Sequence, residues 1–323
     1  MSIRVNLRWV AFSRTVAERS VQRRPCRYSS LTLDGRGACS ANSPPHPPPA
    51  RGKGLCTTLT SILNCALVAG FSGLAHAQTV DLDVPYVTTP QGVTDAMLSI
   101  AHVGKRDYLI DLGSGDGRIV ILAAKKFGAR GLGVEIDPAL VEQSRINAKA
   151  AGVVKQVEFR DQDLFKTELK RASVITMYLL PDVNLALRPK LLALKPGTRI
   201  VSHDWDMGDW RPDAELRVPA PEKKLGLERT SRVMLWKVPA NVEGKWCSRA
   251  HPKTTIDVRQ QYQMIEGNVS GARELTFSGS LDGAILQSAT AGKARARGRD
   301  LVFDRASPFA GAWRRGAHDC VAR

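Results

Sequence analysis

The sequence lacks the patterns that build metal sites. None of its six cysteines belongs to a C-x-x-C pair, and His102, His251 and His318 have no partner at a ligand spacing. Zinc and similar ions are held by cysteines and histidines at short, regular spacings. We therefore expect no metal site.

Acidic residues are scarce in the first 77 residues, where ten Lys and Arg face only Glu18 and Asp34. This segment carries a net charge of +8, half of the formal +16 of the chain. The other 246 residues have only a mild basic excess, which is more typical of a solvated surface than of a nucleic-acid-binding face. A nucleic-acid partner is therefore not expected.

Residues 1–50 have no helical or strand period. They are rich in Arg and Ser and end in SPPHPPPA, a composition that cannot pack a core. We predict a disordered or mis-assigned N-terminal extension. Because Met1 is the only methionine before Met97, a translation start near Arg51 is the alternative.

Residues 51–77 have the layout of an export signal. A short positive segment precedes an uncharged, largely apolar stretch from Leu55 to Phe71, and AHA at 75–77 places small residues where signal peptidase cuts. We predict a signal peptide cleaved after Ala77 and a periplasmic protein. The alternative is an uncleaved membrane anchor, because the apolar run is close to bilayer length. If the signal is not used, the chain stays on the cytoplasmic face.

Cys247 and Cys320 are the only cysteines beyond residue 77. An even pair in an oxidising compartment predicts one disulfide, whereas two reduced, distant thiols would fit a cytoplasmic protein. The disulfide is therefore tied to the export prediction.

Residues 78–240 alternate between strand and helix patterns. A first helix should have Thr89 as its N-cap and Pro90 at its first position. Strands are then expected at 107–112, 131–136, 156–160, 173–179 and 198–203, and helices at 117–127, 138–151 and 182–193. This alternation predicts an α/β fold with a doubly wound, Rossmann-like, mostly parallel sheet and a ligand crevice at the carboxyl ends of its strands.

The motif DLGSGDG at residues 111–117 ends the first of these strands. It departs from the dinucleotide fingerprint G-x-G-x-x-G, and Asp116 places a negative charge where a phosphate would sit. Carboxylates favour a cation such as S-adenosyl-L-methionine, while free N–H groups of the loop would suit its carboxylate or adenosine. At the next two strand ends, Glu135 would accept from the ribose hydroxyls, and Gln162 and Asp163 from the adenine amino group.

These motifs, together with GVEIDP, resemble the class I, seven-stranded S-adenosylmethionine-dependent methyltransferases. More narrowly, VPYVTTP, DLGSGDGRIVI, MYLLPDVN and SHDWDMGDW resemble the mitochondrial lysine methyltransferases of the ATP synthase c-subunit and the adenine nucleotide translocase, with their bacterial relatives. The resemblance covers residues 84–239. The export signal and residues 241–323 depart from it.

The resemblance implies a cofactor site and an acceptor site. Its cofactor-binding residues are Tyr86, Thr88, Asp111, Gly113, Ser114, Gly115, Gly117, Glu135, Gln162 and Asp163, with Pro85, Tyr86 and Thr88 as a lid. Methyl acceptors would approach at Tyr178, after the fourth strand. Alternatively, the neighbouring leucines belong to the core and Pro181 begins the next helix.

A lysine acceptor must lose its proton before it takes the methyl group, which costs about 4–5 kcal/mol at pH 7. His203 and Asp204, after the fifth strand, are candidates to handle that proton beside Tyr178. The alternative is that His203 makes only a structural hydrogen bond.

Residues 241–323 consist of short β-rich segments with glycine turns, including an Asp282-Gly283 hairpin signal. They predict a small antiparallel β-domain. On a strand, Lys293, Arg295, Arg297 and Arg299 would share one face. That face would dock an acidic protein or a membrane surface of anionic lipid, or be an ordinary solvated face.

The sequence therefore predicts an S-adenosyl-L-methionine-dependent methyltransferase (EC 2.1.1.-) whose substrate is a protein lysine side chain. Small-molecule or RNA methylation is one alternative. Because the cofactor is made in the cytoplasm and the chain has an export signal, a non-catalytic nucleoside-binding protein is another. The oligomeric state is not predicted.

Overall fold

The computed structural model of the chain describes residues 87–323 except 224–227, 252, 272–273, 317–319 and 321–323. The predictions for residues 1–77, and those for Pro85 and Tyr86, lie outside the described residues. Within the described part, no helix has both the length and the hydropathy to cross a membrane.

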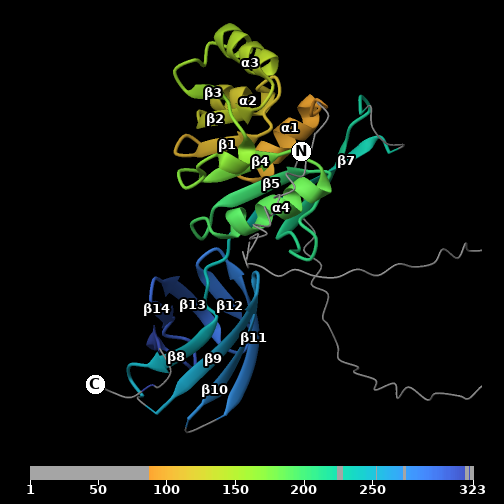
Figure 1. Cartoon of the computed structure of the whole chain (residues 1–323). Helices are drawn as coiled ribbons and strands as arrows, with labels where there is room; N and C mark the ends of the chain where they lie inside the picture. The colour runs from red at the N-terminus through yellow and green to blue at the C-terminus, as the bar shows by residue number, and fades with distance from the viewer. Residues whose placement is uncertain (1–86, 224–227, 252, 272–273, 317–319, 321–323) are drawn as a thin grey trace, which may run out of the picture. The chain divides into compact units, whose positions relative to one another are not determined.

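A seven-stranded sheet forms the first part of the described chain, with the order β3-β2-β1-β4-β5-β7-β6 (Figure 1). Strands β1 to β5 are parallel, and β7 is antiparallel to both β5 and β6. The direction of winding reverses between β1 and β4, which is where α/β sheets open a ligand crevice. The strands are β1 (Tyr108–Leu112), β2 (Arg130–Glu135), β3 (Val157–Asp161), β4 (Val174–Met177), β5 (Arg199–His203), β6 (Ala214–Pro219) and β7 (Thr230–Lys237).

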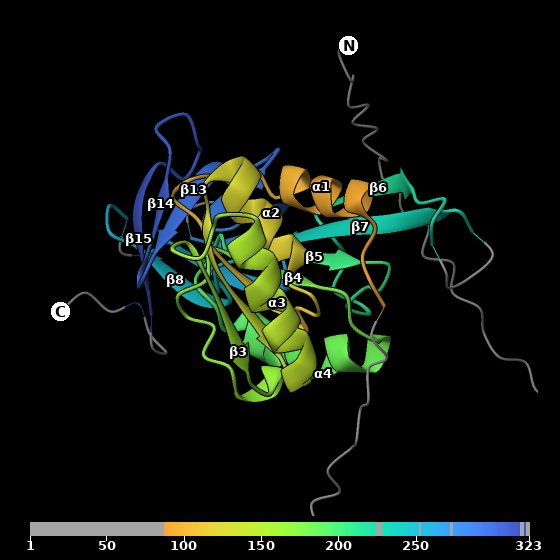
Figure 2. The ribbon, with the colours of Figure 1, turned by 90° about the horizontal axis from the view of Figure 1, so that it is seen from above.

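Helices cover both faces of this sheet. On one face α1, α2 and α3 lie side by side (Figure 2), and their apolar side chains join one buried cluster. On the other face, α4 contributes to a second cluster. Successive residues of β1 alternate between the two, with Leu109 in the first and Ile110 in the second. The helices are α1 (Gln91–Ile100), α2 (Arg118–Phe127), α3 (Pro138–Ala150) and α4 (Pro181–Leu192). The predicted doubly wound α/β architecture is confirmed.

The predicted start of the first helix is wrong. Helix α1 begins at Gln91, Pro90 is its N-cap residue, and no side chain caps it. The hydroxyl of Thr89 lies instead 3.3 Å from Nδ1 of His203 on β5. The side chain of Thr89, which local capping rules assign to the helix, therefore makes a long-range contact with β5 instead.

The second part of the described chain is a closed, eight-stranded antiparallel barrel with the order β10-β11-β12-β13-β14-β15-β8-β9. Its last strand pairs with its first, with Trp313 opposite Ser248. The predicted hairpin is present, with Gly283 and Ala284 as its two loop residues. The strands are β8 (Gly244–Ser248), β9 (Thr255–Gln261), β10 (Met264–Ser270), β11 (Leu275–Asp282), β12 (Ile285–Ser288), β13 (Gly292–Arg297), β14 (Asp300–Phe303) and β15 (Gly311–Arg315).

A disulfide joins Cys247 on β8 to Cys320 beyond β15, with 5.5 Å between the two Cα atoms. The predicted pairing is confirmed. The predicted basic stripe is only partly correct, because Lys293, Arg295 and Arg297 lie exposed on β13 whereas Arg299 lies in the turn after it.

Candidate cofactor and acceptor site

The glycine motif forms the turn between β1 and α2. Gly113, Gly115 and Gly117 have φ angles of 73°, 51° and 79°, a region that L side chains adopt only at a cost. A Cβ atom on Gly113 would lie 3.0 Å from Leu179, and one on Gly117 would lie 2.7 Å from the ring of Phe159. Backbone conformation and close packing thus both require glycine here.

The predicted free N–H groups of this loop are not free. The N–H groups of Gly113 and Ser114 both donate to the carbonyl of Val134, at 2.9 Å each. The N–H of Gly115 donates to the carboxylate of Glu135 at 2.9 Å. The turn stays hydrogen-bonded to the end of β2 because β1 and β2 run in parallel and end together, so the prediction that these donors face a ligand is wrong.

Asp111 is a buried carboxyl group at the end of β1, with 2% of its surface exposed. The hydroxyl of Thr176 donates to it at 2.7 Å. The pKa of Asp111 is raised to about 7, mainly by burial; the hydrogen bond from Thr176 lowers it in part, and the negative charges of Glu135 and Asp116 also raise it. A buried carboxyl group that gives up its proton near neutral pH is suited to face a cation.

Asp116 is paired with Arg118 at 2.6 Å. The guanidinium of Arg118 also donates to the carbonyl of Thr89 at 2.8 Å. The negative charge expected to repel phosphate is therefore compensated within the protein, so the preference for a cation rests on Asp111 and Glu135.

Glu135 lies at the end of β2, next to the glycine turn. Besides the N–H of Gly115, its carboxylate accepts those of Ile136 at 2.8 Å and Asp137 at 3.2 Å. A carboxylate has about four acceptor positions, so capacity remains for a ribose hydroxyl. The side chain of Ile136 is 72% exposed. An exposed apolar surface beside a fixed carboxylate fits the flat, half-apolar adenosine part of the cofactor.

Gln162 and Asp163 lie just beyond β3, as predicted, but both also have structural partners. The carboxylate of Asp163 accepts the N–H of Phe165 at 2.8 Å and caps a short 3-10 helix (Leu164–Lys166). The amide of Gln162 donates to the hydroxyl of Thr167 at 3.0 Å. Thr88 is exposed before α1. The adenine and lid roles of these residues stay predictions.

Tyr178, His203 and Asp204 converge at the ends of β4 and β5. The rings of Tyr178 and His203 stack with 3.8 Å between their centroids. The hydroxyl of Tyr178 donates to Asp204 Oδ2 at 3.5 Å, and His203 Nε2 lies 3.4 Å from the same oxygen. Burial raises the pKa of Tyr178 to about 12, with a further effect of the Asp204 charge. Tyr178 therefore keeps its proton at neutral pH.

His203 is held on both sides by hydroxyl groups. Nδ1 lies 3.3 Å from Thr89 Oγ1 and Nε2 lies 2.9 Å from Ser231 Oγ. Burial lowers the pKa of His203 to about 4, although the charge of Asp204 acts in the opposite direction. A neutral imidazole with both nitrogens occupied is a poor proton acceptor at pH 7. These contacts favour the structural role over proton handling.

Sequence patterns did not indicate the partner of Asp204. Lys223 Nζ lies 2.8 Å from Asp204 Oδ2 and donates to the carbonyl of Thr230 at 3.0 Å. Asp204 has a φ of 62°, which is uncommon for a residue with a side chain. No motif marks Lys223, because it lies between β6 and β7 and meets β5 only in the folded sheet.

Asn184 on α4 fixes the segment after β5. Its amide donates to the carbonyls of Trp205 at 3.1 Å and Asp206 at 3.2 Å. This anchor leaves the indole of Trp205 42% exposed beside the acceptor site. An acceptor would meet an aromatic surface there.

The sheet order, the glycine turn after β1 and the acidic residue at the end of β2 define a class I methyltransferase, for which S-adenosyl-L-methionine is the methyl donor. Residues 111–214 match the family model described as the ANTKMT methyltransferase domain. The chain is 42% identical over 137 residues to a protein-lysine N-methyltransferase of Saccharolobus islandicus, a match that covers 42% of this chain and 85% of that protein. The chain therefore belongs to this family of methyltransferases.

Two further proteins are similar to this chain. The chain is 38% identical to the mouse adenine nucleotide translocase lysine N-methyltransferase over 41% of this chain and 58% of that enzyme, so it spans little more than half of this relative. A crystal structure titled RNA methyltransferase from Salinibacter ruber, in complex with S-adenosyl-L-homocysteine, is 52% identical. It covers 48% of this chain and 96% of that one, with a TM-score of 0.43.

Proposed function

We propose that the protein methylates Nζ of lysine side chains in a protein substrate. The observation that carries this proposal is the ammonium of Lys223, held 2.8 Å from Asp204 beside Tyr178. A carboxylate at the ends of β4 and β5 thus already binds a lysine side chain. The names of the archaeal and mouse relatives, both lysine methyltransferases, support the same substrate class.

The residues at the crevice fit the cofactor. When bound, S-adenosyl-L-methionine supplies an electrophilic methyl group on a sulfonium. Asp111 would face its positive charge, because its carboxyl group is buried at the end of β1 and its hydrogen-bond partner is the neutral hydroxyl of Thr176. Glu135 would accept from the ribose, and Ile136 would cover the base.

The acceptor amine must reach the site neutral. Asp204 and the hydroxyl oxygen of Tyr178 would accept hydrogen bonds from the incoming ammonium and fix its direction. The proton then leaves to water, because Tyr178 keeps its own proton and burial keeps His203 neutral. The amine nitrogen takes the methyl group, and S-adenosyl-L-homocysteine is the other product.

Transfer of labelled methyl groups tests this proposal. Purified full-length protein and labelled cofactor are incubated with membrane and soluble fractions, and the label should appear on lysine in a protein band that resists nuclease. Asp204→Asn should lower acceptor methylation, whereas Asp206→Asn, in the same segment and 50% exposed, is the matched control. Label that nuclease removes, or label only in small molecules, would reject the lysine proposal.

We also propose that the mature protein is exported or anchored at the membrane. The apolar segment before Ala77 supports this, and so does the disulfide, since such bonds persist in oxidising compartments. N-terminal sequencing should identify Gln78 as the first residue of protein from the periplasmic fraction, whereas an anchored protein in the membrane fraction should retain the apolar segment. An intact N-terminus on protein found only in the cytoplasm would contradict export.

A further inference from the structure

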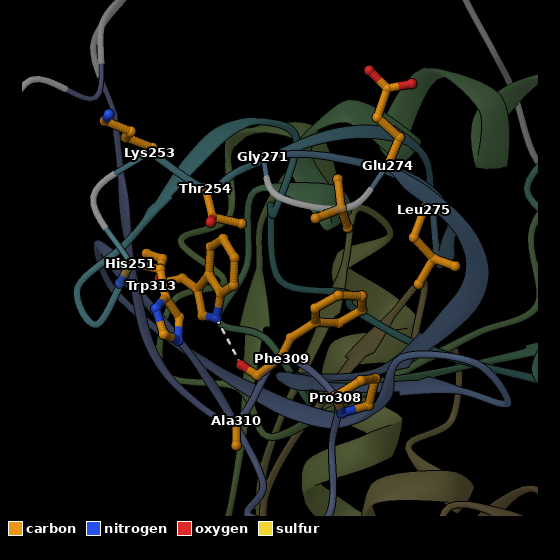
Figure 3. A pocket seen from close by; sticks show the side chains of 12 residues that line it. His251, Lys253, Thr254, Gly271, Glu274, Leu275, Pro308, Phe309, Ala310 and Trp313 are labelled. Atoms are coloured by element: carbon orange, nitrogen blue, oxygen red, sulfur yellow. Dashed lines mark hydrogen bonds between the residues drawn. The ribbon is translucent and has the colours of Figure 1, made fainter.

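One end of the barrel contains a pocket built only from barrel residues. Its volume is about 1220 Å³, and its described lining residues come from positions 248–254, 269–275 and 308–313 (Figure 3). Pockets for small organic ligands are typically about 300–1,000 Å³, and eight-stranded barrels are wide enough to hold one such ligand. The space is therefore adequate for a small molecule.

Apolar side chains form most of the lining. Leu275 and Pro308 lie near the ring of Phe309 (Figure 3). Val269 lines the pocket together with the rings of Phe309 and Trp313. These two rings are nearly perpendicular, at 88°, with 6.3 Å between centroids. A corner of this kind offers one ring face and one ring edge, the two contacts that a flat aromatic ligand prefers.

The wall that carries Phe309 is fixed before any ligand arrives. The indole N–H of Trp313 donates to the carbonyl of Phe309 at 2.8 Å, the dashed line in Figure 3. The hydroxyl of Ser307 donates to Ala291 O at 2.6 Å and accepts the N–H of Phe309 at 3.0 Å. A preformed wall lowers the entropy cost of binding.

The opposite wall supplies the polar groups. The imidazole of His251 lies near Trp313 (Figure 3), and its loop is held because the N–H of His251 donates to Ser248 Oγ at 3.0 Å. Thr254 N–H donates to His251 O at 2.8 Å. Lys253 and Glu274 stand on opposite sides of the opening, so the described lining residues carry one full charge of each sign there (Figure 3).

We propose that this pocket binds a neutral, ring-bearing small molecule with one hydrogen-bonding group. Its ring would lie in the corner between Phe309 and Trp313, and its polar group would face His251. The opposite charges of Lys253 and Glu274, among the described lining residues, favour a neutral ligand over an anion or a cation. The site is independent of the methyl-transfer reaction.

Fluorescence of N-phenyl-1-naphthylamine, a neutral aromatic amine, tests the proposal on the full-length protein. We expect saturable binding of one probe per chain. Leu275→Arg places a charge in the lining and should weaken binding about tenfold or more. Met264→Arg is the matched control, because Met264 is also exposed but lies at the other end of the barrel, beside the β9–β10 turn. It should leave affinity unchanged.

Four results would overturn the proposal. The first is no binding to wild-type protein, and the second is equal affinity of both Arg variants, provided thermal melting shows that both fold. The third is competition by S-adenosyl-L-homocysteine, which would place the probe in the cofactor site. Tighter binding of the anionic probe 1-anilinonaphthalene-8-sulfonate than of the neutral one would reject the neutral ligand class.

Discussion

Lys223 Nζ lies 2.8 Å from Asp204 Oδ2, and the two side chains are only 15% and 12% exposed. The hydroxyl of Tyr178 donates to the same oxygen at 3.5 Å. The chain therefore places its own ammonium group where the acceptor lysine is proposed to bind.

Lys223→Met should lower the KM for the acceptor protein, because the acceptor ammonium no longer competes for Asp204. The free energy of unfolding should fall by about 1–3 kcal/mol, since a buried carboxylate loses a charged partner. Steady-state kinetics and urea unfolding measure the two effects. Lys170→Met, at an 85% exposed position, is the control. A KM that is unchanged or raised would show that Lys223 does not occupy the acceptor position.

Glu135→Ala should weaken cofactor binding about tenfold, because a ribose hydrogen bond to a charged carboxylate, worth about 1.5 kcal/mol, is lost. Glu135→Gln keeps one acceptor oxygen and should lose less. Glu142→Ala, on the exposed side of α3, should bind normally. Calorimetry with S-adenosyl-L-homocysteine gives the affinities. Equal affinity of the Glu135 and Glu142 variants would remove Glu135 from the cofactor site.

Asp111 should make stability depend on pH. Its pKa is about 7 in the folded protein, against the ordinary 3.8 of an aspartic acid, so the folded state holds the proton more tightly. This contribution is fully present below about pH 4 and is lost as the pH rises through 7. Compared with Asp111→Asn, wild-type protein should lose up to about 4 kcal/mol of unfolding free energy over this range. If the unfolding free energies of wild type and Asp111→Asn, measured in urea, changed with pH in the same way, this would contradict a buried, protonated Asp111.

His203 should remain neutral wherever the enzyme works. Its pKa is lowered from 6.5 to about 4, so its contribution to stability is present above pH 6.5 and is lost as the pH falls towards 4. In NMR spectra, the imidazole resonance that is absent from His203→Gln should not shift between pH 8 and pH 5.5. A titration midpoint of this resonance near pH 6.5 would make His203 a candidate proton acceptor again.

The disulfide should supply much of the stability of the barrel. Cys247 and Cys320 are 73 residues apart, and a closed loop of that length corresponds to about 4 kcal/mol in the chain-entropy model. Cys247→Ser should lower the melting temperature of the barrel transition in calorimetry. Reduction of the wild type should reproduce the effect and leave the melting of Cys247→Ser unchanged. Equal melting of oxidised and reduced wild type would contradict a stabilising bond.

The parallel part of the sheet was predictable because its signals are local. The expected strand at 173–179 corresponds to Val174–Met177, and the helix at 182–193 to Pro181–Leu192. β6 was not predicted, because five of its six residues are exposed and give no hydrophobic alternation. Only its pairing with β7 makes it a strand.

The same distinction between local and long-range signals applies to the candidate site. Tyr178, His203 and Asp204 were expected together because parallel strands end at one edge of a sheet. Lys223, Thr89 and Ser231 were not, because they reach this edge from the β6–β7 connection, from the segment before α1 and from the antiparallel strand β7. In the barrel, the pairing of β8 with β15 spans the whole length of the domain, and the Cys247–Cys320 pair was the sequence signal that indicated it.

The pairing of β8 with β15 determines how the barrel can be transferred between proteins. Because the first and last strands are neighbours, the polypeptide enters and leaves the barrel side by side. Modules with adjacent ends can be grafted into a loop of another protein or removed from one without stretching the host backbone. The barrel can therefore be transferred into another protein as one unit, and its pocket would be transferred with it.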